Sequence, residues 1–185
     1  MKNIRISGYD FTLLEFEGND CDFNWSAIAA DPGLRHLPNM PVTEFSMKYG
    51  RIVDRVREHG ASPVILTLPP VDPEKYFAHI TRDFSEEGRR NVLDWLGGTP
   101  DFIREWHEMY NCRVLEMASR KGVPVIDVTS PFYSRPDYGK LLCEDGAHPN
   151  AQGQAVMAGA LEDGLRKIIE ERSLEGLGGV QVAFC

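Results

Sequence analysis

The sequence has no long apolar run, and this absence excludes several kinds of membrane protein. A helix that crosses a bilayer needs about 20 consecutive apolar residues, and no run in the chain approaches that length. The first five residues carry positive charge, but the apolar stretch of a secretory signal does not follow them. We therefore expect a soluble, cytoplasmic protein without membrane insertion.

Positive charge is also scarce. The chain has 20 Lys and Arg residues against 28 Asp and Glu residues, which gives a formal net charge of -8. A protein that binds nucleic acid needs a basic face to neutralise phosphates. The charge balance therefore argues against a nucleic-acid partner and against binding to an anionic membrane surface.

Cysteine is rare and scattered. Cys21, Cys112, Cys143 and Cys185 lack the paired spacing of a metal site, so reduced thiols of a cytosolic protein are the simplest interpretation. The glycines of residues 176–179 do not form a dinucleotide-binding fingerprint, because no strand pattern precedes them and no helix pattern follows. We expect neither a metal ion nor a cofactor.

Apolar residues are plentiful enough for a single domain over residues 1–185, since 42% of the chain is hydrophobic. Three short apolar runs predict strands, and the middle run is apolar almost throughout, as in a parallel sheet buried on both faces. Helical patterns separate the runs, and right-handed crossovers then predict a flavodoxin-like three-layer α/β/α sandwich with a parallel sheet. The expected strands are residues 11–16, 63–68 and 123–128.

Three long helical patterns accompany these strands. The first begins with Thr43 as the expected N-cap, the second covers residues 101–121, and the third covers residues 151–172. Residues 71–100 hold two weak helical patterns with aromatic residues, which we interpret as an insertion that packs locally or covers a site as a lid. His107 lies near the apolar face of the second helix, where packing or a surface position is favoured over catalysis.

Residues 144–150, Glu-Asp-Gly-Ala-His-Pro-Asn, stand just before the last helix. An aspartate three residues before a histidine, in a turn made by glycine, can hold one imidazole nitrogen and leave the other facing outward. The same residues allow Asp145 to form an Asx turn, Asn150 to cap the helix, and His148 to be an ordinary surface histidine. The turn alone leaves both interpretations open.

A second motif, Glu-Gly-Asn-Asp at residues 17–20, follows the first strand, where a parallel sheet carries its sites. With the Asp-Gly-Ala-His-Pro of residues 145–149, it resembles the SGNH (GDSL-type) hydrolases, whose third motif is Gly-x-Asn-Asp and whose fifth is Asp-x-x-His-Pro. In this chain the glycine stands directly before Asn19 rather than one residue earlier. The resemblance covers about residues 9–165.

This resemblance implies an esterase or acylhydrolase that acts on a small-molecule carboxylic ester. His148 matches the residue that takes the proton of the nucleophile, and Asp145 matches the residue that orients this histidine. The side-chain amide of Asn19 matches an oxyanion donor, with Gly18 beside it. Further residues are candidates for substrate binding: Asp20, Phe23, Trp25, Tyr76 and Trp95.

Two motifs of the family are absent: Gly-Asp-Ser with the nucleophilic serine, and the block that contributes an oxyanion glycine. We therefore expect an N-terminally incomplete SGNH hydrolase fold. Loss of the nucleophile from a serine triad lowers turnover about 10⁶-fold, so the chain should be nearly inactive unless another residue substitutes. One alternative is a binding protein that kept the pocket. Another is a metal hydrolase that uses Asp20, Asp22, Asp145 and His148.

Three residues could replace the serine. Ser7 precedes the first strand, and at about 3.3 Å per residue the strand places it at the wrong edge of the sheet. Cys21 adjoins the oxyanion loop, but Asp20 and Asp22 would raise the pKa of its thiol and suppress the thiolate. Cys185 stands at the end of the tail.

The tail, residues 176–185, is a candidate strand after a glycine joint, with the strand pattern at residues 180–184. We expect it to fill the place beside the strand of residues 11–16 that the family's first strand occupies, because an empty place would expose an apolar edge. If the tail runs parallel to its neighbour, Cys185 reaches the edge where the serine would lie. An edge left open would favour pairing with a second copy as a homo-oligomer.

Overall fold

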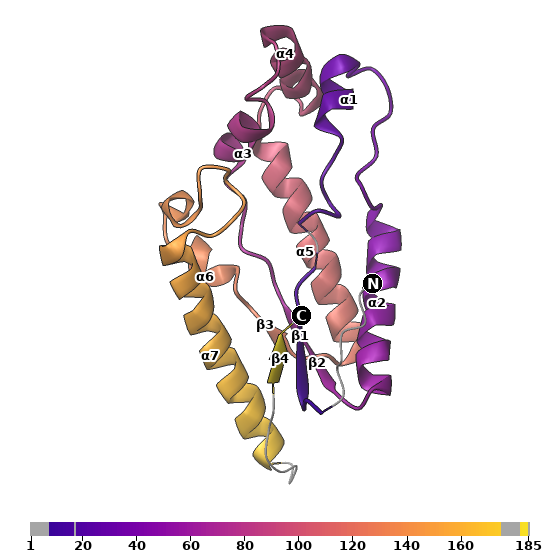
Figure 1. The fold of residues 1–185 in the computed structure, drawn as a ribbon, viewed down its shortest axis with the longest axis vertical. Coiled ribbons are helices and arrows are strands. Elements are labelled where there is room, and N and C mark those ends of the chain that lie inside the picture. Colours follow the sequence, from indigo (N-terminus) through magenta and orange to yellow (C-terminus); the bar gives the residue numbers. More distant parts are fainter. Residues whose placement is uncertain (1–7, 17, 175–181, 185) are drawn as a thin grey trace.

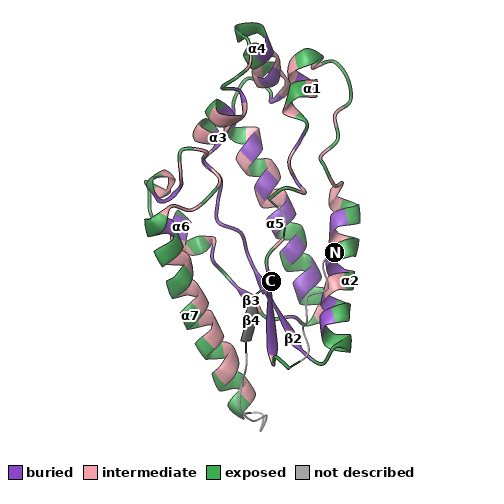
Figure 2. Ribbon diagram, in the orientation of Figure 1, coloured by how far each residue is buried: buried purple, intermediate pink, exposed green. Residues whose placement is uncertain are grey.

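The structure, a computed structural model, describes residues 8–16, 18–174 and 182–184. Figure 1 shows a sheet between long helices in the lower part of the molecule and a group of shorter helices above it. In Figure 2, buried residues line the inner sides of the helices in both parts, and exposed residues face outward.

The sheet is parallel throughout the described residues, with the strand order β3-β2-β1-β4. Its two central strands are in register, with Leu13 of β1 opposite Val64 of β2. The strands are β1 (Phe11–Leu14), β2 (Ser62–Leu66), β3 (Val125–Ile126) and β4 (Val182–Phe184).

The last strand, β4, agrees with the strand expected in the tail. Val182 lies opposite Phe11 and Phe184 lies opposite Leu13, in the parallel direction. The side of β1 that faces away from β2 is therefore covered by a segment from the far end of the chain, which pairs with backbone groups that an open edge would leave unpaired. Cys185 lies outside the described residues.

Both faces of the central strands are buried, which explains why their sequences are apolar almost throughout. Leu14 and Ile65 belong to a cluster with α2 (Val42–Glu58) and α5 (Asp101–Lys121). Phe11, Leu13 and Val64 belong to a cluster on the opposite face, covered by α7 (Ala151–Leu174). A helical layer lies on each side of the sheet, so the expected three-layer α/β/α fold is confirmed. We call the sheet with α2, α5 and α7 the sandwich.

The helices α2 and α5 cover one face of the sheet together. The Tyr49 hydroxyl of α2 donates a hydrogen bond to the Leu14 carbonyl oxygen of β1 over 3.0 Å, which ties the helix to the strand. The expectation that Thr43 caps α2 is wrong: the capping residue is Pro41, whose side chain has no group that could accept a hydrogen bond. α5 has the predicted bounds, and Gly122 ends it in the left-handed conformation, with φ of +58°.

The other face of the sheet belongs to α7, which approaches closely. A Cβ at Gly164 would come within 2.7 Å of Ile126 of β3, so the glycine permits the helix to sit against the strand. Val156 of α7 packs inward beside the buried Phe132 and Leu142. Four further apolar residues of the helix pack on the sheet: Leu161, Leu165, Ile168 and Ile169.

Three short helices form what we call the upper lobe: α1 (Trp25–Ala30), α3 (Pro73–Ile80) and α4 (Glu86–Trp95). Each begins with a side-chain cap. Asn24, Asp72 and Ser85 accept hydrogen bonds from backbone N–H groups of the first turn, each over 3.1 Å. α3 and α4 correspond to the two weak patterns of residues 71–100, whereas α1 was not predicted from the sequence.

The third strand is shorter than the predicted 123–128. The Thr67 hydroxyl accepts the Val128 N–H over 2.9 Å, and the chain turns away into α6 (Ser130–Tyr133) and the 3-10 helix η1 (Tyr138–Leu141). A side chain thus takes the N–H that a longer ladder would have used.

Within the residues that the structure describes, none of the helices has the length and apolarity that a membrane span requires.

Candidate active site

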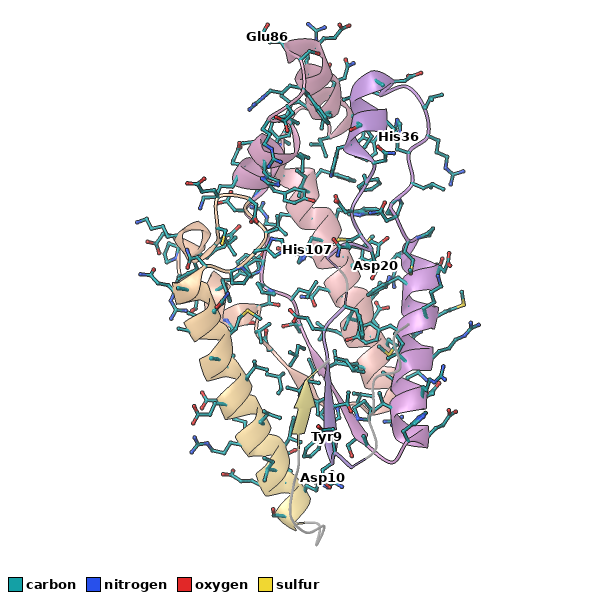
Figure 3. All side chains as sticks on the ribbon, in the orientation of Figure 1. Tyr9, Asp10, Asp20, His36, Glu86 and His107 are labelled. Carbon is teal, nitrogen blue, oxygen red and sulfur yellow. The ribbon has the colours of Figure 1, made fainter. Side chains whose placement is uncertain are left out.

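A cavity of about 630 Å³ opens between the carboxyl edge of the sheet and the upper lobe. Figure 3 shows Asp20 and His107 in this region, and Tyr9 and Asp10 at the opposite end of β1. Ser7 lies outside the described residues, but Gly8 and Tyr9, which follow it, precede the amino end of the strand. The lining residues come from five stretches of the chain: Glu15, Phe16, Gly18 to Phe23, Trp25, Leu68, Pro69, Val71, Tyr76, Phe102, Ile103, Trp106, His107, Ala147 to Pro149, Gln154 and Met157.

The turn before α7 holds a paired carboxylate and imidazole. Asp145 Oδ2 lies 2.9 Å from His148 Nδ1, while Asp145 Oδ1 accepts the backbone N–H groups of Ala147 and His148 over 2.9 and 3.0 Å. Asn150 Oδ1 accepts the N–H groups of Gln152 and Gly153, and so caps α7. The Asx turn and the Asp145–His148 pair are therefore both present, because Asp145 uses Oδ1 for the turn and Oδ2 for the histidine.

These contacts fix the protonation of the pair. Burial alone would raise the pKa of Asp145, but the hydrogen bonds from the His148 and Ala147 backbone and from the imidazole outweigh it and lower the pKa to about 2. An ionised carboxylate can only accept, so Nδ1 of His148 carries the proton. The side chain of His148 is 81% exposed, and its Nε2 is left as the basic atom of the neutral ring.

The turn itself depends on Gly146. This residue has φ of +74°, and a Cβ there would come within 2.5 Å of the Tyr76 backbone nitrogen. The Gly146 carbonyl oxygen accepts the Asp72 N–H over 2.8 Å, next to the first turn of α3. The turn that holds Asp145 and His148 therefore meets the upper lobe at this glycine.

The loop after β1 brings Gly18 and Asn19 to the same cavity as His148. Three hydrogen bonds from residues 39 and 40 hold this loop. Asn39 Nδ2 donates to the Asn19 carbonyl oxygen over 2.9 Å. The backbone N–H groups of Asn39 and Met40 donate to the backbone carbonyl oxygens of Asp22 and Asp20 over 2.7 and 2.9 Å. The backbone that carries Asn19 is thus fixed from outside the loop.

Aromatic rings form the wall of the cavity on the side of the upper lobe. Phe23 is central: its ring centroid lies 5.6 Å from Trp25 and 5.3 Å from Trp106. Trp25 and Tyr76 meet edge to face at 6.5 Å. Trp95, a candidate for substrate binding, packs 5.0 Å from the Phe23 ring and is not among the residues that line the cavity.

Three carboxylates lie among these rings. Asp22 Oδ1 accepts the Trp25 indole N–H over 2.7 Å. Burial, and then the charge of Asp22, raise the pKa of the Tyr76 hydroxyl, which stays protonated and able to donate. Burial also raises the pKa of Glu15 and of Asp20, although the charge of Lys48 partly offsets the effect on Asp20. Glu15 is an exposed residue, but part of its carboxyl group's surroundings is protein rather than solvent.

A second histidine and a cysteine also line the cavity. His107 of α5 is 8% exposed, and burial lowers the pKa of its imidazole to about 4, so the ring is neutral at pH 7. Cys21 is 6% exposed, and its thiol donates to the Gly18 carbonyl oxygen over 3.5 Å. The thiol that was considered as a substitute nucleophile is thus hydrogen-bonded within the loop that carries Asn19.

The residues proposed for a metal site do not gather. Within the described ranges, no three His, Cys, Asp or Glu residues form a group that could hold a metal ion, and Asp20, Asp22, Asp145 and His148 are all described. The geometry therefore gives no support to the metal hydrolase.

Sequence reasoning missed several lining residues. Phe102 and Trp106 fit the apolar period of the helix predicted over residues 101–121, and nothing in a helical period distinguishes a residue of the core from one in a cavity wall. Glu15 had a usable signal, a charged residue at the carboxyl end of an otherwise apolar strand. Gln154 and Met157 lie on the first turns of α7, whose direction past the cavity only the fold reveals.

Comparison with known proteins agrees with this geometry. The model of the GDSL-like lipase/acylhydrolase family matches residues 7–156. The GDSL esterase/lipase CPRD49 of Arabidopsis thaliana is 26% identical over 151 residues, which make up 80% of this chain and 51% of that protein. The chain thus spans about half the length of this curated relative.

Solved structures share the fold. A GDSL-like lipase from Bacteroides thetaiotaomicron matches with a TM-score of 0.55 and 12% identity, over 86% of this chain and 63% of that one. LAE5, an alpha/beta hydrolase enzyme from the metagenome of Lake Arreo in Spain, matches with a TM-score of 0.54 and 19% identity, over 84% and 59%. At these identities the likeness shows the architecture alone.

Proposed function

The chain belongs to the GDSL-like lipase/acylhydrolase family, and from this premise we propose that it supplies the base, the orienting acid and an oxyanion donor for hydrolysis of a carboxylic ester. One observation carries the proposal. His148, held by Asp145, and Asn19, held in its loop, line the same cavity although 129 positions separate them in the sequence. We infer that a small carbonyl compound bound in this cavity contacts both.

The proposed chemistry is a proton transfer coupled to attack on the carbonyl carbon. His148 Nε2 removes a proton from the attacking O–H group, and the Asp145 carboxylate stabilises the imidazolium ion that results. The Asn19 side-chain N–H donates to the carbonyl oxygen as it becomes negative, a contribution of about 3 kcal/mol in comparable sites. The imidazolium then returns its proton to the leaving alcohol as the C–O bond breaks.

The scheme requires an O–H group that attacks the carbonyl carbon. No Gly-Asp-Ser occurs in the 185 residues, so in this chain alone the O–H group is that of water. Without the nucleophile of a serine triad, an oxyanion hole and binding retain an acceleration of about 10³ to 10⁴ over water. We expect slow hydrolysis of activated esters that depends on His148.

The absence of that motif also favours a second candidate function, a binding protein that retains the cavity and has no turnover. The two functions differ in one measurable respect, because only the hydrolase needs the basic atom of His148. A binding protein would give the same background rate with and without this imidazole.

Hydrolysis of p-nitrophenyl acetate tests the proposal. Any exposed imidazole slowly cleaves this ester, so the rate of the His148→Ala variant must be compared with that of a His59→Ala variant, which loses another exposed histidine far from the cavity. The proposal predicts that His148→Ala lowers the rate at least about tenfold and that His59→Ala leaves it unchanged. Equal rates for all three proteins would favour the binding function.

The two cysteine candidates are tested in the same assay. We expect Cys21→Ala and Cys185→Ala to keep the rate, because water is the proposed attacking group and the Cys21 thiol is buried next to Asp20 and Asp22. A rate lost with either substitution would identify that thiol as the attacking group in place of water.

A further inference from the structure

Among the described residues that line the cavity of His148 and Asn19, the acidic side chains have no basic counterpart. Glu15, Asp20 and Asp22 contribute carboxylates to its lining, and no Lys or Arg is found among the described residues that line it. Lys48 acts on Asp20 through its charge, but its ammonium group is paired with Glu44 at 2.7 Å on the surface of α2. The Lys48 ammonium group is thus shared with a surface carboxylate and does not line the cavity.

The carboxylate of Asp22 is placed next to aromatic rings. Its Oδ1 accepts the Trp25 indole N–H over 2.7 Å, and Tyr76 lies close enough for its hydroxyl to interact with the same carboxylate. The Trp25 and Tyr76 rings are 6.5 Å apart, and both line the cavity. The Asp22 carboxylate therefore lies at the polar edges of both rings, where the Trp25 N–H and the Tyr76 hydroxyl point. A cavity lined by aromatic rings and carboxylates favours alkylammonium ions, since ring faces and carboxylates both attract positive charge.

Resting on the proposed ester hydrolysis, we propose that the cavity selects esters that carry an ammonium group, with Asp22 as the residue that determines this specificity and the adjacent Trp25 and Tyr76 as aromatic contacts. The raised pKa values of Glu15 and Asp20, caused by burial, show that the anionic forms of these side chains are not fully compensated in the cavity. A bound cation would supply the missing positive charge.

Two other kinds of ester fit less well. An ester with a carboxylate or phosphate group would meet three acidic side chains without a Lys or Arg to pair with, which disfavours binding. A neutral sugar ester could stack on Trp25 and Trp106, but it would leave the charge of the carboxylates uncompensated. Its binding is therefore an outcome that the test must be able to reveal.

Intrinsic fluorescence can measure binding without turnover. All three tryptophans of the chain lie at this site: Trp25 and Trp106 line the cavity, and Trp95 packs 6.2 Å from Trp25. The probes are acetylcholine and its uncharged carbon counterpart, 3,3-dimethylbutyl acetate, which have the same shape around the ester. An acetylated methyl glucoside serves as the neutral sugar ester.

The expected result is a dissociation constant about tenfold lower for acetylcholine than for its neutral counterpart at low ionic strength. The Asp22→Asn variant keeps an acceptor for the Trp25 N–H and should reduce this ratio to about one, whereas Asp163→Asn, an exposed change on α7, should preserve it. Equal binding of the two esters by the unaltered chain, or tighter binding of the sugar ester, would overturn the inference without reference to any variant.

This test and the test of the proposed function can fail separately. A chain that prefers the cationic ester but shows no turnover dependent on His148 contradicts the hydrolase and leaves the charge preference standing. A chain that hydrolyses p-nitrophenyl acetate through His148 but binds both esters equally contradicts only the charge preference.

Discussion

The sandwich and the upper lobe are built from different kinds of contact. In the sandwich, aliphatic side chains of β1 and β2 are buried on both faces of a parallel sheet, and long helices cover them. In the upper lobe, short helices with side-chain caps enclose rings that meet edge to face, among them Phe23, Trp95 and Phe102. The sandwich positions the groups proposed for chemistry, and the lobe adds Trp25 of α1 and Tyr76 of α3 to the wall of the cavity.

The contacts between the sandwich and the upper lobe, which we call the seam, explain why the site needs both regions. Asn19 follows β1 and His148 precedes α7, both elements of the sandwich, yet the turn that carries His148 packs against the first turn of α3 through Gly146. Trp106 of α5 donates its indole N–H to the Cys21 carbonyl oxygen over 2.8 Å, which ties the loop of Asn19 to the helix that runs through both regions. Changes in one region should therefore have effects that can be separated from changes in the other.

The largest expected effect belongs to chemistry alone. Asp145→Asn offers an amide donor to Nδ1 of His148 and so favours the tautomer whose Nε2 carries the proton and cannot act as a base. The part of the p-nitrophenyl acetate rate that depends on His148 should fall by up to about 10⁴-fold. Ligand binding measured by tryptophan fluorescence should stay within about twofold, and loss of both together would show that chemistry and recognition are not divided in this way.

The second prediction compares the two cores directly. Ile65→Ala, at a fully buried position of β2, should lower the free energy of unfolding by about 2–5 kcal/mol, with far-UV circular dichroism and tryptophan fluorescence changing together in urea. Phe77→Ala, in the core of the lobe, removes about 3–5 kcal/mol of local packing. Because the tryptophans report on the lobe, their transition should precede the transition seen by circular dichroism. Coincident transitions in the second variant would show that the lobe is not a separate unit of stability.

At the seam itself, a methyl group should suffice to disturb the site. Gly146→Ala places a Cβ at a positive φ and within 2.5 Å of the Tyr76 backbone nitrogen, so the turn must move away from α3. We expect a loss of about 1–3 kcal/mol in thermal or urea unfolding, together with loss of the activity that depends on His148. Gly159→Ala on α7, where an added Cβ meets nothing within 4 Å, is the matched control and should be neutral or slightly stabilising.

The smallest expected effect is a loss of folding stability at low pH. The pKa of Asp145 is about 2 in the folded chain, below its ordinary value of 3.8, so its contribution to stability is present above about pH 4 and is lost as the pH falls toward 2. The difference in unfolding free energy between the unaltered chain and Asp145→Asn should therefore be constant from pH 7 to 5 and shrink between pH 4 and 2. A difference that persists at pH 2 would mean that the carboxylate is not stabilised by this turn.

The two regions also differ in how far the sequence determines them. α5 could be predicted to its bounds because its apolar period and Gly122 both act locally. The third strand was expected to continue to Val128, but the Thr67 hydroxyl, 61 positions away, takes the N–H that the ladder would need. α1 was missed because its six residues are held by the packing of Ile28 in the lobe rather than by a period long enough to recognise.

The candidate site shows the same division. The pairing of Asp145 with His148 lies within one turn, so residue types and spacing were enough to predict it. That Asn19 lines the same cavity followed from a rule about parallel sheets, which acts on the whole fold. Glu15 and Trp106 become part of the wall only through the arrangement of β1 and α5, which a single sequence does not encode locally.

The central claim is that one small molecule contacts both Asn19 and His148. Nuclear magnetic resonance of the ¹⁵N-labelled chain, titrated with p-nitroacetanilide as the slowly hydrolysed amide counterpart of p-nitrophenyl acetate, measures this most directly. The account predicts that the Asn19 side-chain amide and the His148 imidazole shift with one common midpoint, while Asn91 and His59 do not respond. A shift at only one of the two residues, or two different midpoints, would contradict it.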